Sequence, residues 1–96
     1  MNSYRLSEAA DTDIEHILER SIEVWGFDRA EAYLISLHHT FGRLAEFPNS
    51  GRDVSSLRSG YFRAEHESHS IFYRKITEGI LIIRVLHQKM QPKRHL

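Results

Sequence analysis

Residues 68–87, SHSIFYRKITEGILIIRVLH, decide the fold, because two runs of β-branched, aromatic and polar residues alternate on either side of a glycine. The two runs, Ser68–Ile76 and Ile80–His87, predict two β-strands. The same kind of pattern predicts a third strand over Tyr61–Glu67, and a shorter strand is expected at Ser3–Leu6. The second half of the chain is therefore expected to form a small sheet.

The pairing of the last two strands decides which side chains this sheet exposes. A two-residue turn at Glu78–Gly79 pairs Thr77 with Ile80 and sets Tyr73 opposite Arg84. A slip of one residue would exchange the two faces. With this register, the face that packs under the rest of the fold carries Phe72, Ile76, Leu81, Ile83 and Val85. The exposed face carries His69, Ile71, Tyr73, Lys75, Ile82, Arg84 and Leu86.

The first half of the chain predicts two helices. Apolar residues recur at three- and four-residue steps over residues 10–25 and again over residues 30–45. Ser7 suits the N-cap of the first helix, Gly26 follows its end, and Asp28 begins a capping-box pattern for the second. The short link makes the helices an antiparallel hairpin. The sequence thus predicts an α+β fold of order β-α-α-β-β-β, with the helical hairpin packed on a small, mostly antiparallel sheet.

Composition limits the class of protein. The 96 residues, of which 41% are hydrophobic and 27% charged, suit one soluble globular domain spanning residues 1–96. The longest apolar run, Ile80–Ile83, is far shorter than the roughly 20 residues that a membrane span needs. The absence of cysteine excludes disulfides and thiolate chemistry. We therefore expect a cytoplasmic protein with no membrane partner.

Charge is distributed unevenly along the chain. Residues 1–47 carry four arginines against nine acids, and residues 48–96 carry nine basic residues against four acids. The halves therefore have net charges of −5 and +5. Either the two halves attract each other within the fold, or the second half presents a basic surface to an acidic or nucleic-acid-bound partner.

The strands also carry residue types that acid–base chemistry uses. RNA cleavage needs a base, a cation for the phosphate and an acid. Strand alternation opposes a complete set, because Arg84 and His87 are three residues apart and so face opposite ways, as do His66 and His69. In the alternative interpretation, Arg63 and Arg84 bind acidic groups and the histidines are surface or core residues. No histidine spacing matches a chelating pair, so neither a metal site nor a cofactor is predicted.

Several short motifs occur in an order that is typical of one known family. They are Tyr4-Arg5-Leu6-Ser7, Asp13-Ile14-x-x-Ile17, Trp25-Gly26, Leu44-Ala45-x-x-Pro48-x-x-Gly51-Arg52, Leu57-Arg58-x-Gly60, His69-x-Ile71-Phe72-Tyr73-Arg74 and Ile82-Ile83-Arg84-Val85-Leu86-His87-Gln88-x-Met90. Over nearly its whole length the sequence resembles the ParE branch of the RelE/ParE toxin–antitoxin superfamily. The resemblance implies the fold predicted above and a ParD-like antitoxin partner with an extended C-terminal segment.

The resemblance also implies an activity. ParE-like toxins inhibit DNA gyrase, whereas RelE-like relatives cut messenger RNA on the ribosome. This chain lacks the dense cluster of lysine and arginine of the RelE branch and ends in His95-Leu96 rather than a His-Tyr pair. We therefore expect a non-enzymatic toxin that binds gyrase and meets DNA only through gyrase or the antitoxin complex. The alternatives are a ribosome-dependent mRNA endonuclease and an inactive relic that only binds antitoxin.

Two sets of site residues follow as predictions. The extended antitoxin is expected to cover an unpaired sheet edge and a groove between the helices, whose walls are Trp25, Tyr33 and Leu37. The target is expected to contact the exposed sheet face and the basic C-terminal segment. The residues predicted for target binding are Arg63, His69, Tyr73, Arg84, His87 and Arg94.

Overall fold

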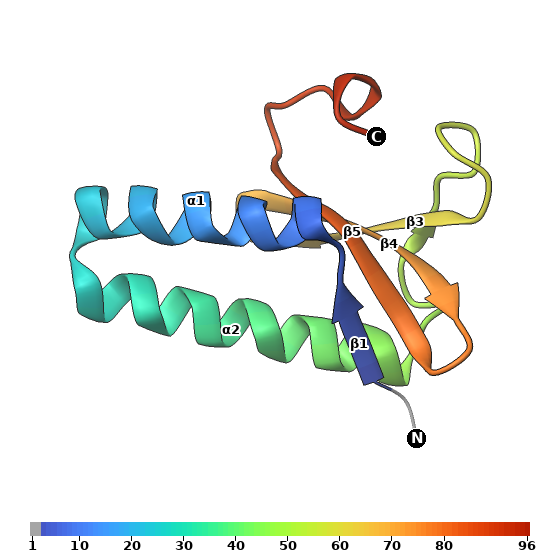
Figure 1. The fold of residues 1–96 in the computed structure, drawn as a ribbon, viewed down its shortest axis with the longest axis horizontal. Coiled ribbons are helices and arrows are strands. Elements are labelled where there is room, and N and C mark those ends of the chain that lie inside the picture. Colours follow the sequence, from blue (N-terminus) through green and yellow to red (C-terminus); the bar gives the residue numbers. More distant parts are fainter. Residues whose placement is uncertain (1–2) are drawn as a thin grey trace.

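The protein folds into two layers, a helical hairpin and a five-stranded sheet, in a computed structural model that describes residues 3–96 (Figure 1). The elements in chain order are β1 (Ser3–Leu6), α1 (Glu8–Trp25), α2 (Phe27–Glu46), β2 (Arg52–Asp53), β3 (Tyr61–His66), β4 (His69–Ile76), β5 (Gly79–His87) and the 3₁₀ helix η1 (Pro92–Arg94). The predicted α+β class and the order β-α-α-β-β-β are confirmed. The short strand β2 and the helix η1 are additions to that prediction.

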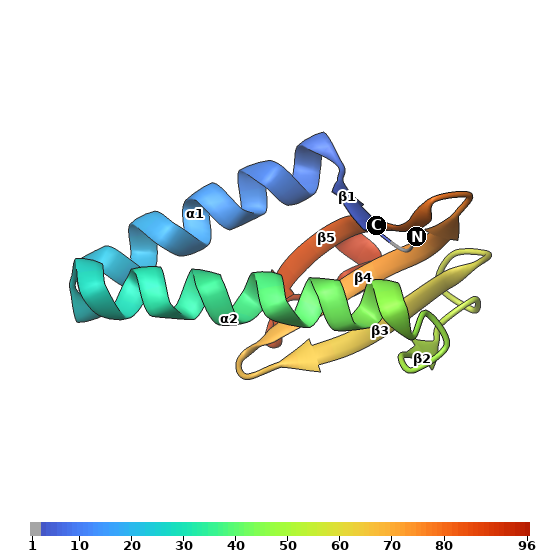
Figure 2. The ribbon, with the colours of Figure 1, turned by 90° about the horizontal axis from the view of Figure 1, so that it is seen from below.

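The sheet brings the first strand beside the last one. Its strand order is β1-β5-β4-β3-β2, with β1 parallel to β5 and every other pair antiparallel. Both helices cover the same side of the sheet, here called the inner face, and the free end of the hairpin projects beyond it (Figure 2). At the other edge β2 pairs with β3 only at Phe62 and Arg63, so β3 residues 64–66 have no strand partner on that edge.

Local signals set the helix ends. Ser7 caps α1 as predicted, because its Oγ accepts a hydrogen bond from the Ala10 amide at 3.0 Å and also donates one to the Ile83 carbonyl at 2.7 Å. Gly26, with φ +87°, turns the chain directly from α1 into α2. The predicted capping box at Asp28 is wrong, because α2 already begins at Phe27, and its N-cap Gly26 has no side chain to accept a hydrogen bond.

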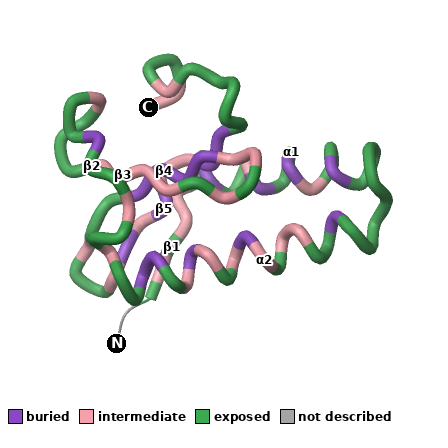
Figure 3. Tube along the Cα trace, turned by 180° about the vertical axis from the view of Figure 1, so that it is seen from behind, coloured by how far each residue is buried: buried purple, intermediate pink, exposed green. Residues whose placement is uncertain are grey.

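The main core lies between the helices and the inner face. Its members are Ala10, Ile14, Ile17, Leu37, Phe41, Leu44, Ala45, Ile71, Tyr73, Ile80, Ile82 and Val85. A smaller cluster occupies the opposite, outer face, where the C-terminal residue Leu96 packs against Phe72 and Leu86. Buried residues concentrate where the helices cross the sheet, and the far end of the hairpin is exposed (Figure 3).

The predicted register of the β4–β5 hairpin is wrong. The turn is at Thr77–Glu78, so that Ile76 pairs with Gly79 and Tyr73 pairs with Ile82. A bulge then shifts the register by one residue, which sets Phe72 opposite Arg84. The predicted faces are therefore exchanged over most of the hairpin. The residues expected to be exposed that instead lie in the main core are Ile71, Tyr73 and Ile82.

The β3–β4 hairpin corrects a second prediction. The chain turns at Glu67–Ser68, where Glu67 adopts a left-handed conformation with φ 51°. His66 and His69 are therefore partners across the turn rather than neighbours on one straight strand. The alternation that would point them to opposite faces does not apply, and both rings lie on the inner side, against α2.

Candidate binding surfaces

Arg84 ties three parts of the fold together. Its Nε and Nη2 donate to the two carboxylate oxygens of Asp13 on α1, each at 2.8 Å, and its Nη1 donates to the His95 carbonyl at 2.9 Å. Asp13 also accepts a hydrogen bond from the Val85 amide at 3.0 Å, on the part of β5 that extends past its pairing with β1. The side chains of Arg84 and Asp13 are only 21% and 11% exposed. The predicted placement of Arg84 on an open face opposite Tyr73 is therefore wrong.

Tyr73 is a core residue rather than a surface residue. Its ring is fully buried, and its hydroxyl donates to the Pro48 carbonyl at 2.9 Å and accepts from the Gly51 amide at 3.0 Å. Burial raises the pKa of the Tyr73 hydroxyl, despite the opposing hydrogen bond from Gly51. Tyr73 thus holds the loop after α2 against the sheet, where a target does not reach it.

Histidines gather on the inner side of the sheet, near the β3–β4 turn. The Tyr33 hydroxyl lies 2.6 Å from His69 Nδ1, and the rings of His69 and His87 meet edge to face with centroids 5.7 Å apart. Both ring nitrogens of His66 are also engaged, by Ser36 Oγ at 3.1 Å and Thr40 Oγ1 at 2.8 Å. We call Tyr33, His66, His69 and His87 the histidine cluster.

The surroundings of the histidine cluster favour the uncharged forms of two of its members, His69 and Tyr33. Burial lowers the pKa of His69, and the neighbouring His87 and His66 lower it further. Burial, together with the negative charge of Glu67, raises the pKa of Tyr33 to about 12. The Tyr33 hydroxyl therefore keeps its proton, and it is hydrogen-bonded both to the His66 carbonyl, at 3.3 Å, and to His69 Nδ1. The cluster joins α2 to the ends of β3 and β4, and its exposed member is His87.

Arg63 lies on the outer face, across the sheet from these imidazoles. Its Nε donates to Glu65 at 2.7 Å, its Nη2 donates to Ser70 Oγ at 2.9 Å, and its guanidinium covers the Phe72 ring at 5.5 Å. Ser70 in turn donates to the other oxygen of Glu65 at 2.9 Å. Arg94, in η1, is exposed. The residues predicted for target binding therefore do not form one surface.

The free end of the helical hairpin is an exposed apolar surface. Trp25 is 53% exposed, and Val24 and Phe27 on either side are exposed to a similar extent. The Arg29 guanidinium lies 5.8 Å from the Trp25 ring centroid. Tyr33, two turns further along α2, is half-buried in the histidine cluster. Leu37 is fully buried in the core, so it is not accessible as a groove wall.

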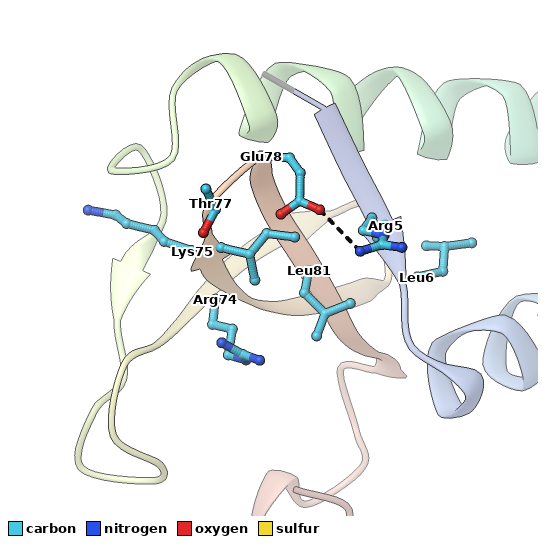
Figure 4. A pocket seen from close by; sticks show the side chains of 8 residues that line it. Arg5, Leu6, Arg74, Lys75, Thr77, Glu78 and Leu81 are labelled. Atoms are coloured by element: carbon cyan, nitrogen blue, oxygen red, sulfur yellow. Dashed lines mark hydrogen bonds and ion pairs between the residues drawn. The ribbon is translucent and has the colours of Figure 1, made fainter. Parts of the chain in front are cut away.

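Among the hollows lined by residues 3–96, two border the sheet. One, of about 700 Å³, follows the open edge of β3 and is lined by Phe47, Arg43 and Arg52 among others. The other, of about 680 Å³, lies near the β4–β5 turn and is lined by Arg5, Arg74 and Leu81 among others (Figure 4). The prediction from sequence missed Arg5 and Arg74, because only the parallel pairing of β1 with β5 brings them together.

No group of three or more histidine, aspartate or glutamate side chains within residues 3–96 is placed to hold a metal ion. No helix in this range is long and apolar enough to cross a membrane.

The geometry defines a small α+β protein with a helical hairpin on one face of a mixed sheet. A solved structure titled "Chromosomal ParDE TA system from P. aeruginosa" contains a chain with this fold, with a TM-score of 0.77 and 20% identity. The match covers 91% of this chain and 96% of that chain.

Sequence comparison narrows this class to a family. The family described as "ParE toxin of type II toxin-antitoxin system, parDE" matches residues 4–92. Toxin ParE1 of Mycobacterium tuberculosis is 42% identical over 94 residues, covering 97% of this chain and 96% of the relative. Toxin ParE1 of Caulobacter vibrioides is 41% identical over 96 residues, covering 100% and 99%. The chain belongs to the ParE toxin family of type II toxin–antitoxin systems, as the resemblance predicted.

Proposed function

We propose that this ParE-family toxin acts by inhibiting DNA gyrase and is neutralised by a ParD-like antitoxin. The observation that carries the proposal is the family match over residues 4–92, together with relatives named ParE1 over almost the whole chain. The similar fold in a structure titled as a ParDE system supports the kind of antitoxin. Contact with DNA is expected only through gyrase or the antitoxin complex.

The separation of charged groups supports binding rather than catalysis. In-line cleavage of RNA requires a base, a cation and an acid within about 3 Å of the reacting atoms. His69 and His87 lie on the inner side of the sheet, whereas Arg63 is on the outer face, bonded to Glu65 and Ser70. Both nitrogens of His66 are already hydrogen-bonded. The arrangement therefore favours a toxin that acts by binding its target rather than by catalysis.

An assay pair separates this function from the endonuclease alternative. Purified toxin should block supercoiling by gyrase and increase cleaved DNA, while messenger RNA in a translation extract stays intact. Codon-phased cuts in the mRNA that vanish with His69→Ala would contradict the proposal and favour the ribosome-dependent endonuclease. A protein that neither inhibits gyrase nor cuts mRNA but still binds antitoxin would instead be an inactive relic.

The antitoxin surface is proposed to combine the hairpin end and the open edge of β3. Apolar anchors of an extended partner would cover Trp25 and its neighbours, and its backbone would pair beyond Arg63, where β2 stops. Phe47, which is 64% exposed, lines the hollow along that edge. Hydrogen exchange should therefore slow in residues 22–29 and 64–67 when antitoxin binds.

A matched pair of substitutions tests the hairpin end. Trp25→Ala should weaken antitoxin binding by at least about tenfold, because large aromatic anchors dominate such interfaces. Met90→Ala removes a similarly exposed apolar side chain in the C-terminal segment and should leave the affinity within about twofold. Equal effects of the two substitutions, or no protection of residues 22–29, would contradict the proposed surface.

A further inference from the structure

The hollow beside the β4–β5 turn is a cationic surface with an apolar floor. Leu81 on β5 pairs with Arg5 on β1 and with Arg74 on β4, so the two guanidinium groups flank one leucine on the outer face. Figure 4 shows Leu81 between the two arginines, with Glu78 reaching toward Arg5 from the turn. Arginine is suited to carboxylates because its planar fork donates two parallel hydrogen bonds.

The two arginines differ in what they bind within the chain. Arg5 Nη1 donates to Glu78 at 3.1 Å, with the side chains 68% and 48% exposed. Arg74 is exposed, and within residues 3–96 it makes no ion pair. An exposed cation at the middle of a sheet face, next to a leucine, gains little for the fold. Arg74 is therefore available to bind a negatively charged group in the hollow.

The Arg5–Glu78 contact indicates the chemistry that the hollow accepts. Glu78 places a carboxylate at the rim, beside Leu81 (Figure 4). Exposed ion pairs contribute little to stability, so a carboxylate from outside can replace Glu78 without disturbing the fold. Glu78 thus marks one of two carboxylate positions, and Arg74 defines the other.

We infer that this hollow binds an extended acidic segment of another protein. Arg5 and Arg74 lie two strands apart, about 10 Å at the backbone, and side chains at alternate positions of an extended chain lie about 7 Å apart. Long arginine side chains span that difference. One carboxylate binds Arg74, another replaces Glu78 on Arg5, and an aliphatic side chain of the segment covers Leu81.

The floor of the hollow favours a peptide over a nucleic acid. Within residues 3–96 its apolar lining is aliphatic, from Leu6, Ile76 and Leu81, with no aromatic side chain. Single-stranded nucleic acids bind where bases stack on aromatic rings along a basic groove. The hollow is also distinct from the hairpin end and the β3 edge, so the inference does not rest on the proposed function.

Fluorescence anisotropy with the full-length toxin tests the inference. The probe is a labelled peptide of alternating glutamate and leucine, and its control replaces each glutamate by glutamine. Arg74→Gln should weaken binding of the acidic probe by about tenfold, the loss of one charge-assisted contact. Arg20→Gln removes the same charge from an exposed position on α1 and should leave the affinity within about twofold.

A gain of affinity gives the sharper test. Glu78→Gln should tighten binding about threefold, because the internal carboxylate no longer competes for Arg5. Glu19→Gln changes the net charge equally at a distant, exposed site on α1 and should have no effect. Thermal melting of each variant verifies that it is folded.

Four results would overturn the inference. Equal effects of Glu78→Gln and Glu19→Gln, or of Arg74→Gln and Arg20→Gln, would show that the peptide responds to net charge alone. Equal affinity for the glutamine control peptide would remove the carboxylates from the interaction. Tighter, Arg74-dependent binding of a single-stranded oligonucleotide of about twelve nucleotides would assign the hollow to nucleic acid.

Discussion

On the inner face of the sheet the polar side chains hydrogen-bond to one another and to α2, whereas on the outer face Arg5 has an exposed partner and Arg74 has none within residues 3–96. Among those residues no buried side-chain nitrogen or oxygen lacks a hydrogen bond. Polar groups that are satisfied internally stabilise a fold, and cations left without partners are free to bind. The inner face therefore supports the structure, and the outer face is the more available for recognition.

The largest expected effect comes from comparing a buried phenylalanine with an exposed one. Phe41, within α2, is fully buried, and Phe47, the residue directly after α2, is 64% exposed. Phe41→Ala should lower the free energy of unfolding by about 3–5 kcal/mol and Tm by more than about 10 °C. Phe47→Ala should change the free energy of unfolding by less than about 1 kcal/mol. Similar losses in urea denaturation would break the comparison.

Ion pairs give the next largest effect. Arg84→Met leaves Asp13, whose side chain is only 11% exposed, without its cationic partner, and we expect a loss of about 2–3 kcal/mol in the free energy of unfolding. Arg5→Met removes the exposed pair with Glu78 and should cost less than about 1 kcal/mol. A double-mutant cycle with Asp13→Asn measures the coupling. An unchanged melting temperature in Arg84→Met would return Arg84 to the set of residues free for target binding.

Two glycines sharpen the comparison with effects of opposite sign. A Cβ on Gly51 would overlap the Tyr73 hydroxyl, so Gly51→Ala should destabilise the protein by about 1–3 kcal/mol. A Cβ on Gly42, inside α2, meets no atom within 4 Å. Gly42→Ala should therefore stabilise the protein by about 0.5–1 kcal/mol, as alanine does in helices. Guanidinium denaturation of both variants measures the signs, and the same sign for both would contradict the expectation.

The smallest effect concerns pH. The pKa of His69 is lowered from its usual 6.5 in the folded protein, so the unfolded chain binds the proton more readily. Stability should therefore fall as pH drops below about 6.5 and should continue to fall until the folded-state pKa is passed. His69→Gln should flatten this part of the pH profile of the urea midpoint. His16→Gln, on the exposed side of α1, should not flatten it.

Local patterns predicted the elements of this fold, and distant pairing decided what they could not. Ser7 and Gly26 mark the helix ends because their roles depend only on neighbouring residues. The β4–β5 register depends on a bulge and on a turn that no alternation of apolar residues specifies, so Tyr73 and Arg84 were assigned to the wrong surroundings. The candidate site depends on the same register.

The hairpin end and the hollow also differ in how far the sequence predicted them. Trp25 was proposed as a groove wall from its place in a helix stripe, and it is exposed because the hairpin extends past the sheet (Figure 2). Arg5 and Arg74 are 69 positions apart and meet only through β5. The sequence alone therefore did not predict that these two arginines lie on either side of one residue of β5.

The position of β1 beside β5 also governs when the protein can fold during synthesis. The parallel pairing joins Ser3–Leu6 to residues near 80, and β5 also supplies Ile80, Ile82 and Val85 to the core. Ribosomes add about 5–20 residues per second, so β1 waits roughly 4–15 seconds for its partner. Until β5 emerges, the nascent chain has a helical hairpin without the sheet that buries its apolar stripe. A toxin of this topology is therefore without its folded surfaces while it is being translated, and gains them only when its last strand is released.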